Sequence, residues 1–301
     1  MVSPATDTSL ARVLTHDPPP ERVNAADASC AQPPQPPRER HLGPARVVEE
    51  RQLSALSAAL RITFAVCVYA VCAPIVLAAL LVCLPSRKAR IKIGNVTGQF
   101  TGGLAVWLTG SAYHVRGVEH LDRDRPAIYV ANHASLLDIA LGIWLAPVGT
   151  VGVAKKEIIF YPFFGQYYWL SGHLRIDRKN ARQALKSLQV LCALVKRHAL
   201  SVFIWPEGHR APDGRLRSFK RGAFRLALET KLPIVPVVIA GSHRAWPAKA
   251  VRLTRTNVAI TCLPAIDTTD WTSATLGQHV KEIEALFAAA LPPEQRPLPP
   301  A

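Results

Sequence analysis

"PAIYVANHASLLDIALGIWLA", residues 126 to 146, begins as an apolar strand pattern, breaks at Asn132-His133 and continues as a helical pattern. Its first residues are rich in the β-branched and aromatic side chains that favour a strand. Ser135 is a typical helix N-cap, which predicts a helix over 135 to 146. A strand that runs directly into a helix is the repeating unit of an α/β fold.

The same alternation of short strands and helices continues to residue 290. Strands that alternate with helices of this length predict an α/β domain with a mostly parallel sheet flanked by helices. In such folds the active site lies at the carboxyl ends of the strands. The other predicted strands are 113–118, 150–156, 173–177, 201–206, 234–240 and 257–263, and the other predicted helices are 157–170, 179–198, 219–230 and 274–290.

His133 and Asp138 are the two polar groups at the carboxyl end of the strand over 126 to 132. His133 precedes the helix and Asp138 lies near its second turn, so the carboxylate can reach one imidazole nitrogen. The other nitrogen would then be a general base near neutral pH, suited to taking a proton from an alcohol. The alternatives are a turn histidine beside a solvated carboxylate, or a serine-hydrolase triad, whose G-x-S-x-G motif is absent from the sequence. Zinc would need further clustered ligands.

The segment "FIWPEGHRAPDGRLRSFKRGAF", residues 203 to 224, carries a second polar cluster after another strand. A tight turn over 207 to 210 follows the strand, and residues 220 to 222 open the next helix. A guanidinium on such a turn, with a lysine and backbone N–H groups at a nearby helix start, can bind a phosphate. A salt-bridged surface loop is the alternative.

Basic residues bracket the aromatic stretch "KKEIIFYPFFGQYYWLSGHLRIDR", residues 155 to 178. Its aromatic side chains are more numerous than one helix face of a small core requires. They suit an interfacial helix or the wall of an acyl channel. Ordinary core packing is the alternative.

Residues 62 to 85, "ITFAVCVYAVCAPIVLAALLVCLP", are 24 residues without a charge. At about 1.5 Å per residue, such a helix spans a hydrocarbon core of roughly 30 Å, which predicts membrane attachment. A buried soluble helix is the alternative, and Pro74 permits a kink or a re-entrant hairpin in place of a clean span. A Gly-rich run over 96 to 113 suits an interfacial helix packed against this segment. The denser basic cluster follows the apolar run, which places what comes next in the cytoplasm.

The formal net charge of +15 is unevenly distributed. Residues 1 to 50 hold five arginines against seven acids, which leaves +17 on the rest of the chain. Such a surface attracts nucleic acid, anionic lipid or phosphorylated and acyl-carrier substrates. A histidine and an aspartate embedded at strand ends, in place of a continuous basic stripe, argue against nucleic acid. Six scattered cysteines without a C-x-x-C spacing predict reduced thiols and no metal site.

Composition divides the chain into four parts. Residues 1–50 contain nine prolines and predict a disordered tail. We expect a membrane-anchoring helical region over 51–112, an α/β domain over 113–291 and a Pro-rich C-terminal tail over 292–301.

Four ordered motifs resemble those of the 1-acylglycerol-3-phosphate O-acyltransferases, the lysophosphatidic acid acyltransferase family of glycerolipid synthesis. The resemblance covers roughly residues 60 to 265. The motifs are "NHASLLD" (132–138), similar to the family's N-H-x-x-x-x-D block, "KEIIFYPFFGQYYWLSGHLRIDR" (156–178), "PEGHR" (206–210) with "FKRGAF" (219–224), and "PIVPVVI" (233–239).

The resemblance implies a membrane-bound enzyme that moves an acyl group from acyl-CoA or acyl-carrier protein to the sn-2 hydroxyl of 1-acylglycerol 3-phosphate, giving phosphatidic acid. It implies no cofactor, no metal and no acyl-enzyme; the partners are a lysophospholipid acceptor, the acyl donor and membrane lipids. His133 would be the general base and Asp138 its orienting partner. The implied substrate-binding residues are Glu207, Gly208, Arg210, Lys156, Arg178 and Lys220, and the residues that support the motifs are Asn132, Pro206, Gly222 and Pro236.

One residue departs from the family pattern. The third motif usually reads E-G-T-R, and His209 stands in place of the threonine. Another lysophospholipid, lyso-ornithine lipid or glycerol 3-phosphate therefore stays open as the acceptor, as does a non-catalytic basic membrane-anchored lipid-binding protein. Arg210 favours a phosphorylated acceptor. The resemblance also implies that an N-terminal helical pair beds into the membrane, and we expect it at the cytoplasmic face of a bacterial inner membrane.

Overall fold

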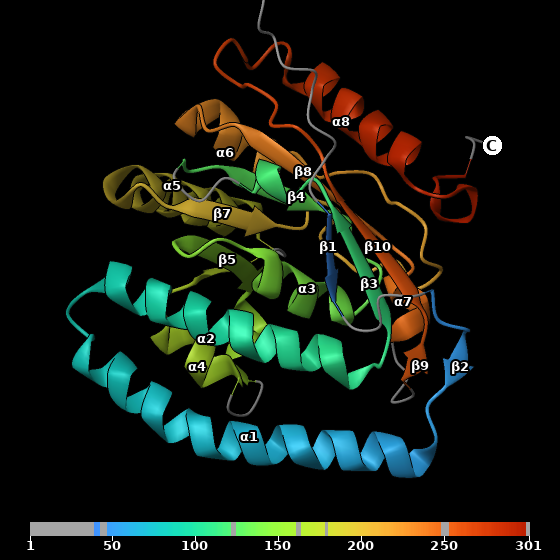
Figure 1. Ribbon diagram of the computed structural model, residues 1–301. Coiled ribbons are helices and arrows are strands. Elements are labelled where there is room, and N and C mark those ends of the chain that lie inside the picture. The colour runs from blue at the N-terminus through green and yellow to red at the C-terminus, as the bar shows by residue number, and fades with distance from the viewer. Residues whose placement is uncertain are drawn as a thin grey trace, which may run out of the picture. The chain divides into compact units, whose positions relative to one another are not determined.

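The computed structural model describes residues 39–42, 47–121, 125–160, 164–177, 180–247 and 253–298. Its centre is an eight-stranded sheet with the strand order β1-β3-β10-β8-β4-β7-β5-β6 (Figure 1). Neighbouring strands run parallel except in the β1–β3 and β10–β8 pairs, which are antiparallel. The predicted α/β fold with a mostly parallel sheet is confirmed.

Every strand predicted from the sequence is present, with ends shifted by at most a few residues. A separate two-stranded sheet pairs β2 (Arg51–Gln52) with β9 (Thr254–Arg255). The strands of the large sheet are β1 (Glu39–Leu42), β3 (Ala112–Arg116), β4 (Ile128–Ala131), β5 (Thr150–Lys155), β6 (Leu174–Ile176), β7 (Ser201–Ile204), β8 (Ile234–Ala240) and β10 (Asn257–Cys262).

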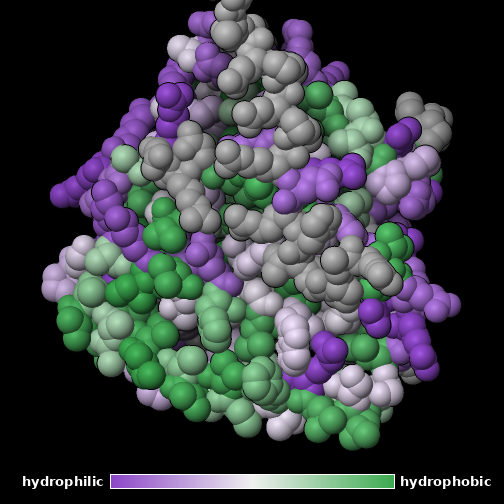
Figure 2. All heavy atoms as spheres, viewed as in Figure 1, coloured by the Kyte–Doolittle hydropathy of each residue, from purple (hydrophilic) through white to green (hydrophobic). Residues whose placement is uncertain are grey.

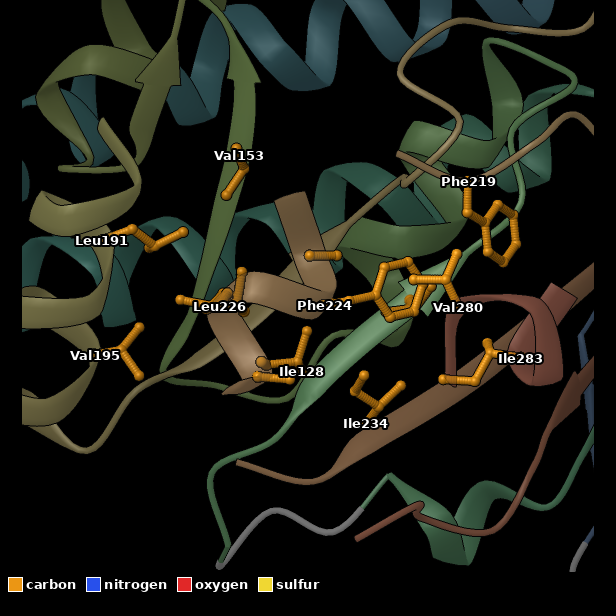
Figure 3. Close-up of a cluster of buried hydrophobic side chains, with 14 of the residues drawn as sticks. Ile128, Val153, Leu191, Val195, Phe219, Phe224, Leu226, Ile234, Val280 and Ile283 are labelled. Carbon is orange, nitrogen blue, oxygen red and sulfur yellow. The ribbon is translucent and has the colours of Figure 1, made fainter. Parts of the chain in front are cut away.

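One face of the sheet is covered by α5 (Ala181–His198), α6 (Gly222–Thr230) and α8 (Leu276–Ala290). Figure 3 shows the core beneath them, in which Phe224 and Ile128 are fully buried. Burying one side chain of this size contributes about 1.5 to 3 kcal/mol. This core fixes α6 against the central strands.

The opposite face is covered by α3 (Leu137–Leu145), α2 (Arg87–Leu108) and the short α7 (Ser242–Ala245). Successive side chains of β4 alternate between the two cores, with Ile128 in the first and Tyr129 in the second. This alternation follows from the two-residue period of a strand, and burial on both faces explains the continuous apolar pattern of the central strands.

The single helix predicted over 157–170 is instead two pieces. A 3₁₀ turn covers Lys156–Phe160, and α4 covers Phe164–Leu170. The sequence contains a proline between them, which lacks the N–H that a continuous helix needs.

α1 (Ala55–Val82) contains most of the predicted apolar segment and is long and apolar enough to cross a membrane, by length and composition. The helix continues through Pro74, so the re-entrant break that this proline permitted is absent. Ala65 and Leu80 are its buried residues, and hydrophobic side chains gather in the lower part of Figure 2, where Figure 1 draws α1. This exposure argues against a buried soluble helix.

α2 begins at residue 87, not at 96 as predicted. The hydroxyl of Ser86 accepts the Ala89 N–H at 3.3 Å and caps the helix, so the basic segment after α1 is helical. α2 packs against α1 as expected, and it also packs along α3. The two N-terminal helices are therefore attached to the α/β domain through α2.

Glycines on α2 allow this close approach to α3. A Cβ at Gly98 would lie 2.6 Å from Ile143 Cγ2, and one at Gly102 would lie 2.7 Å from the Ala140 carbonyl oxygen. Any larger side chain at these positions would push the helices apart. The glycines of this run therefore allow α2 to pack closely on α3 of the α/β domain.

Part of the predicted disordered tail belongs to the domain. β1 pairs with β3, and the Asn257 amide exchanges two hydrogen bonds with the Val48 backbone at 2.7 and 2.8 Å. The expected tail over 1–50 is thus wrong for 39–42 and for Val48, because partners elsewhere in the chain satisfy their backbone groups. Residues 1–38 lie outside the described part of the chain.

The expected Pro-rich tail over 292–301 is also wrong for its first residues. A 3₁₀ turn, Pro293–Gln295, follows α8, and Gln295 is 1% exposed. Its amide satisfies buried backbone groups, which holds the segment on the domain. Residues 299–301 lie outside the described part of the chain.

Candidate active site

The carboxylate of Asp138 holds the imidazole of His133 at the carboxyl end of β4. His133 Nδ1 lies 3.1 Å from Asp138 Oδ2, which also accepts the N–H groups of Ala134 and Ser135 at 2.6 and 2.7 Å. Asp138 is fully buried and lies in the first turn of α3, not the second. The His133 side chain is 12% exposed. With Nδ1 donating to the carboxylate, Nε2 is the nitrogen that can accept a proton.

The side chain of Asn132 anchors the turn that carries His133. Its Oδ1 accepts the Ile239 N–H and its Nδ2 donates to the Ile239 carbonyl, both at 2.8 Å. Asn132 thus continues the pairing of β4 with β8 beyond the end of β4. Because it is buried, replacing it would leave the Ile239 backbone without these partners.

Sequence reasoning missed the role of Trp205 as a neighbour of the imidazole. Its ring centroid lies 5.3 Å from that of His133, and it also packs on Phe203 of β7 at 5.1 Å. The indole therefore limits the movement of the His133 ring. Its position directly before "PEGHR" in the third motif was the available signal.

The carboxylate of Glu207 joins the His133 turn to the segment after β7. Its Oε1 accepts the His133 N–H at 2.6 Å, and its Oε2 accepts the Arg217 N–H at 3.0 Å. Glu207 is 4% exposed. Both oxygens are thus used by backbone groups, which differs from the phosphate contact that the resemblance implied. A carboxylate would also repel a phosphate.

Burial raises the pKa of Glu207 to about 7, although the two backbone N–H groups favour its ionised form. The nearby Asp138 carboxylate adds to the increase in pKa. Glu207 therefore changes protonation near neutral pH, whereas an exposed glutamate is ionised there.

Residues 207–221, which we call the basic loop, connect β7 to α6. Gly208 has a φ of 75°, and a Cβ there would lie 2.9 Å from Lys220 Nζ, so the turn requires glycine. This turn brings the Lys220 ammonium beside the motif. The exposed basic side chains of the loop are Arg210, Arg217, Lys220 and Arg221.

Both ends of the basic loop are tied near His133. The Ala211 N–H donates to the His133 carbonyl at 2.9 Å, and the Lys220 N–H donates to the Pro206 carbonyl at 2.8 Å. The helix predicted from residue 219 begins at Gly222, with Arg221 as its N-cap residue. The structure therefore brings the basic loop and the His133 turn together, as the phosphate-site hypothesis required.

Lys156 lies at the carboxyl end of β5, on the same edge of the sheet as the His133 turn. Its Nζ lies 2.6 Å from Asp177 Oδ2, and this hydrogen bond raises the pKa of Lys156. The lysine is paired, so it adds little net charge to the edge. Arg178 lies outside the described residues.

The structure places two further motif residues, Pro236 and Gly222. Pro236 lies inside β8, opposite Val130 of β4, and its carbonyl accepts the Leu263 N–H at 2.9 Å. Gly222 opens α6. Apart from its chain neighbours and the backbone of its own helix, no atom of the described residues lies within 4 Å of the position that a Cβ would take. Packing therefore does not require glycine at 222.

The aromatic stretch serves two purposes. The Tyr168 hydroxyl lies 2.7 and 3.0 Å from the Gly152 and Leu174 carbonyl oxygens, which share its single proton, and is part of the core. Phe160 and Trp169 are 80% and 54% exposed. Core packing therefore accounts for only part of the stretch.

The metal-site and cysteine predictions can be compared with the structure for the described residues only. Among these, no group of three or more His, Cys, Asp and Glu side chains could hold a metal ion. Their cysteines, Cys67, Cys72, Cys83, Cys192 and Cys262, are free thiols.

This chain is similar to known acyltransferases. The Acyltransferase family model matches residues 112–240. The 1-acyl-sn-glycerol-3-phosphate acyltransferase of Limnanthes alba is 43% identical over 215 residues, which cover 71% of this chain and 76% of that protein. The human 1-acyl-sn-glycerol-3-phosphate acyltransferase beta is 33% identical, over 68% of this chain and 74% of that protein. The crystal structure of the 1-acyl-sn-glycerophosphate (LPA) acyltransferase PlsC from Thermotoga maritima has a TM-score of 0.63 and 27% identity, over 77% of this chain and 96% of that chain.

Proposed function

This chain belongs to the 1-acyl-sn-glycerol-3-phosphate acyltransferases, and we propose accordingly that it transfers a fatty acyl group to the sn-2 hydroxyl of 1-acylglycerol 3-phosphate, giving phosphatidic acid. The observation that supports this most strongly is the His133–Asp138 pair, connected through Glu207 to the basic loop. The proposed donor is acyl-CoA or acyl-carrier protein.

In the proposed mechanism, His133 Nε2 takes the proton from the acceptor hydroxyl as its oxygen attacks the thioester carbonyl. The resulting tetrahedral intermediate breaks its carbon–sulfur bond, and the imidazolium returns the proton to the leaving thiolate. Asp138 accepts a hydrogen bond from the Nδ1–H group throughout, which fixes the tautomer and stabilises the imidazolium. The proton taken from the acceptor hydroxyl thus leaves with the thiol, and His133 returns to its neutral form.

The proposed site for the acceptor phosphate is the basic loop, with Arg210 and Lys220 as its binding groups. Both are exposed beside the tied ends of the loop, and a guanidinium binds phosphate through two parallel hydrogen bonds. Glu207 is assigned a positioning role in place of direct binding, because its oxygens accept the N–H groups of His133 and Arg217. His209 lies beside Arg210 and is the residue most able to alter acceptor choice.

A panel of acceptors tests this function. With purified protein and one acyl-CoA or acyl-carrier protein, kcat/KM for 1-acylglycerol 3-phosphate should exceed that for the monoacylglycerol of equal chain length by about 10²-fold, because the latter has no phosphate for Arg210 and Lys220 to bind. Arg210→Ala should erase most of this preference. Faster transfer to lyso-ornithine lipid, to another lysophospholipid or to glycerol 3-phosphate would replace the proposed acceptor. If no acceptor is acylated, the remaining interpretation is a non-catalytic lipid-binding protein.

The protein is membrane-associated, and we propose that α1 lies along the membrane surface in place of spanning it. α2 packs on α3 of the α/β domain, and α1 packs against α2, as Figure 1 shows. A spanning α1 would carry α2 and the domain into the hydrocarbon core. The exposed aromatic side chains Phe160 and Trp169 suit the same interface. We assign the cytoplasmic face, in a bacterium that of the inner membrane, because basic residues open α2 and the cytoplasmic leaflet has a negative surface potential that attracts them.

Cysteine labelling distinguishes the two arrangements of α1. Ser54 and Ser86 cap the starts of α1 and α2, and both are exposed. In a cysteine-free background in sealed vesicles, Ser54→Cys and Ser86→Cys should both react with an impermeant maleimide from the side on which Ser218→Cys, in the basic loop, reacts. If Ser54→Cys and Ser86→Cys react from opposite sides of the vesicle membrane, α1 spans the membrane.

A further inference from the structure

The side chain of Gln295 connects parts of the chain that are far apart in sequence. It is 1% exposed, its Oε1 accepts the Gly241 N–H at 2.8 Å, and its Nε2 donates to the Gly214 carbonyl at 3.0 Å. Its backbone carbonyl accepts the Leu216 N–H at 2.8 Å. Gly214 and Leu216 belong to the basic loop, and Gly241 directly follows β8.

The residues around Gln295 reinforce this connection. Residues 291–296, which we call the C-terminal strap, fold back on themselves, with Arg296 Nε donating to the Leu291 carbonyl at 2.9 Å. Arg215 of the basic loop donates to the Arg296 carbonyl at 3.1 Å. In α8, the Glu284 carboxylate accepts the backbone N–H of Phe219. C-terminal residues thus fix the tip of the basic loop.

β8 links this connection to the proposed base. Gln295 ties the loop to Gly241 at the end of β8, and Asn132 ties the His133 turn to Ile239 within β8. The basic loop and the imidazole are therefore both positioned from one strand. A shift of the loop relative to β8 is also a shift relative to His133.

We propose that Gln295 is a positioning residue that sets the distance between the basic loop and His133, and thereby the affinity for the acceptor phosphate. This inference rests on the proposed function. Gln295 touches no reacting atom, and it lies beyond residues 112–240, which the family model matches. It acts through the backbone of Gly214 and Leu216.

The chemistry of the site requires an amide. The Gly214 carbonyl needs a donor and the Gly241 N–H needs an acceptor, and one carboxamide supplies both. Glutamate would keep the acceptor and place a second oxygen against the Gly214 carbonyl. Alanine would leave both backbone groups without these partners. Gln295→Glu therefore removes one of the two side-chain bonds, and Gln295→Ala removes both.

The test uses the full chain in lipid and has two readouts. Gln295→Ala should raise KM for 1-acylglycerol 3-phosphate about tenfold, while kcat and KM for the acyl donor stay within about twofold. Amide hydrogen exchange over 211–221 should become faster. Gln295→Glu should change both readouts in the same direction, because it also loses the bond to the Gly214 carbonyl.

Gln278→Ala is the matched control, because Gln278 is an exposed glutamine on α8 whose side chain, among the described residues, donates to Glu282 alone, at 2.8 Å. It should leave both readouts unchanged. Equal acceptor KM in the Gln295 variants, with kcat reduced only in proportion to the folded fraction, would overturn the proposal. So would unchanged exchange over 211–221. The exchange measurement needs no activity, so a failure of the proposed function, seen as no acylation by the unmodified protein, is distinguishable from a failure of this tie.

Discussion

His133→Ala should lower kcat for acyl transfer by about 10²- to 10⁴-fold, the usual effect of losing a general base. The imidazole is replaced by a methyl group, so no side chain at position 133 can take the proton of the acceptor hydroxyl. KM for acceptor and donor should change little, since the basic loop keeps its ties to Pro206 and to the strand β8. Steady-state kinetics in detergent or lipid measure this directly.

Asp138→Asn should reduce kcat by a comparable factor, because an amide can donate to Nδ1 and select the wrong tautomer. It should also lower stability, since Asp138 Oδ2 accepts the N–H groups of Ala134 and Ser135 in a fully buried position. His133→Ala keeps these two bonds and should lower stability less. His198→Ala, in the last turn of α5, is the control for loss of an imidazole away from the site. A His133→Ala protein with normal kcat would exclude His133 as the base.

The His133–Asp138 contact could be predicted from the sequence because both residues lie within one strand-to-helix unit. The strand pattern, the helix pattern and the five-residue spacing are local, and local patterns survive in almost any fold of that unit. The same reasoning located the strands of the sheet. The sequence reasoning placed Asp138 in the wrong turn of α3. The reason is that it began the helix at Ser135, whereas α3 begins at Leu137.

The partners of Glu207 could not be predicted, because they are backbone groups. Its two bonds reach His133, 74 positions away, and Arg217, 10 positions away. A backbone N–H has no side-chain identity, so no motif records it, and the motif alone suggested a substrate contact. Gln295 is a similar case, with partners 54 and 81 positions away. Tail composition also concealed its role, since a Pro-rich segment resembles a disordered end unless its buried contacts are known.

Glu207→Gln should lower kcat by about 10²-fold with little change in acceptor KM. Gln keeps one acceptor oxygen, but its NH₂ group would face the N–H of either His133 or Arg217. The His133 backbone would then shift, and a misplacement of about 1 Å can lower the rate about 10²-fold. A direct contact between Glu207 and the acceptor would instead change acceptor KM, so steady-state kinetics separate the two roles.

Stability provides a second and independent test of Glu207. Its pKa is raised from 4.5 to about 7 by burial, so between these pH values the folded protein binds a proton that the unfolded chain has released. The free energy of unfolding should therefore decrease as pH rises through this range, by about 3 kcal/mol from this group. Gln does not titrate, so Glu207→Gln should lack this decrease, and its stability relative to the unmodified protein should improve with rising pH. Chemical denaturation at pH 4.5, 6 and 8 measures the difference. Parallel curves for the two proteins would show that Glu207 does not titrate as a buried carboxyl group between pH 4.5 and about 7.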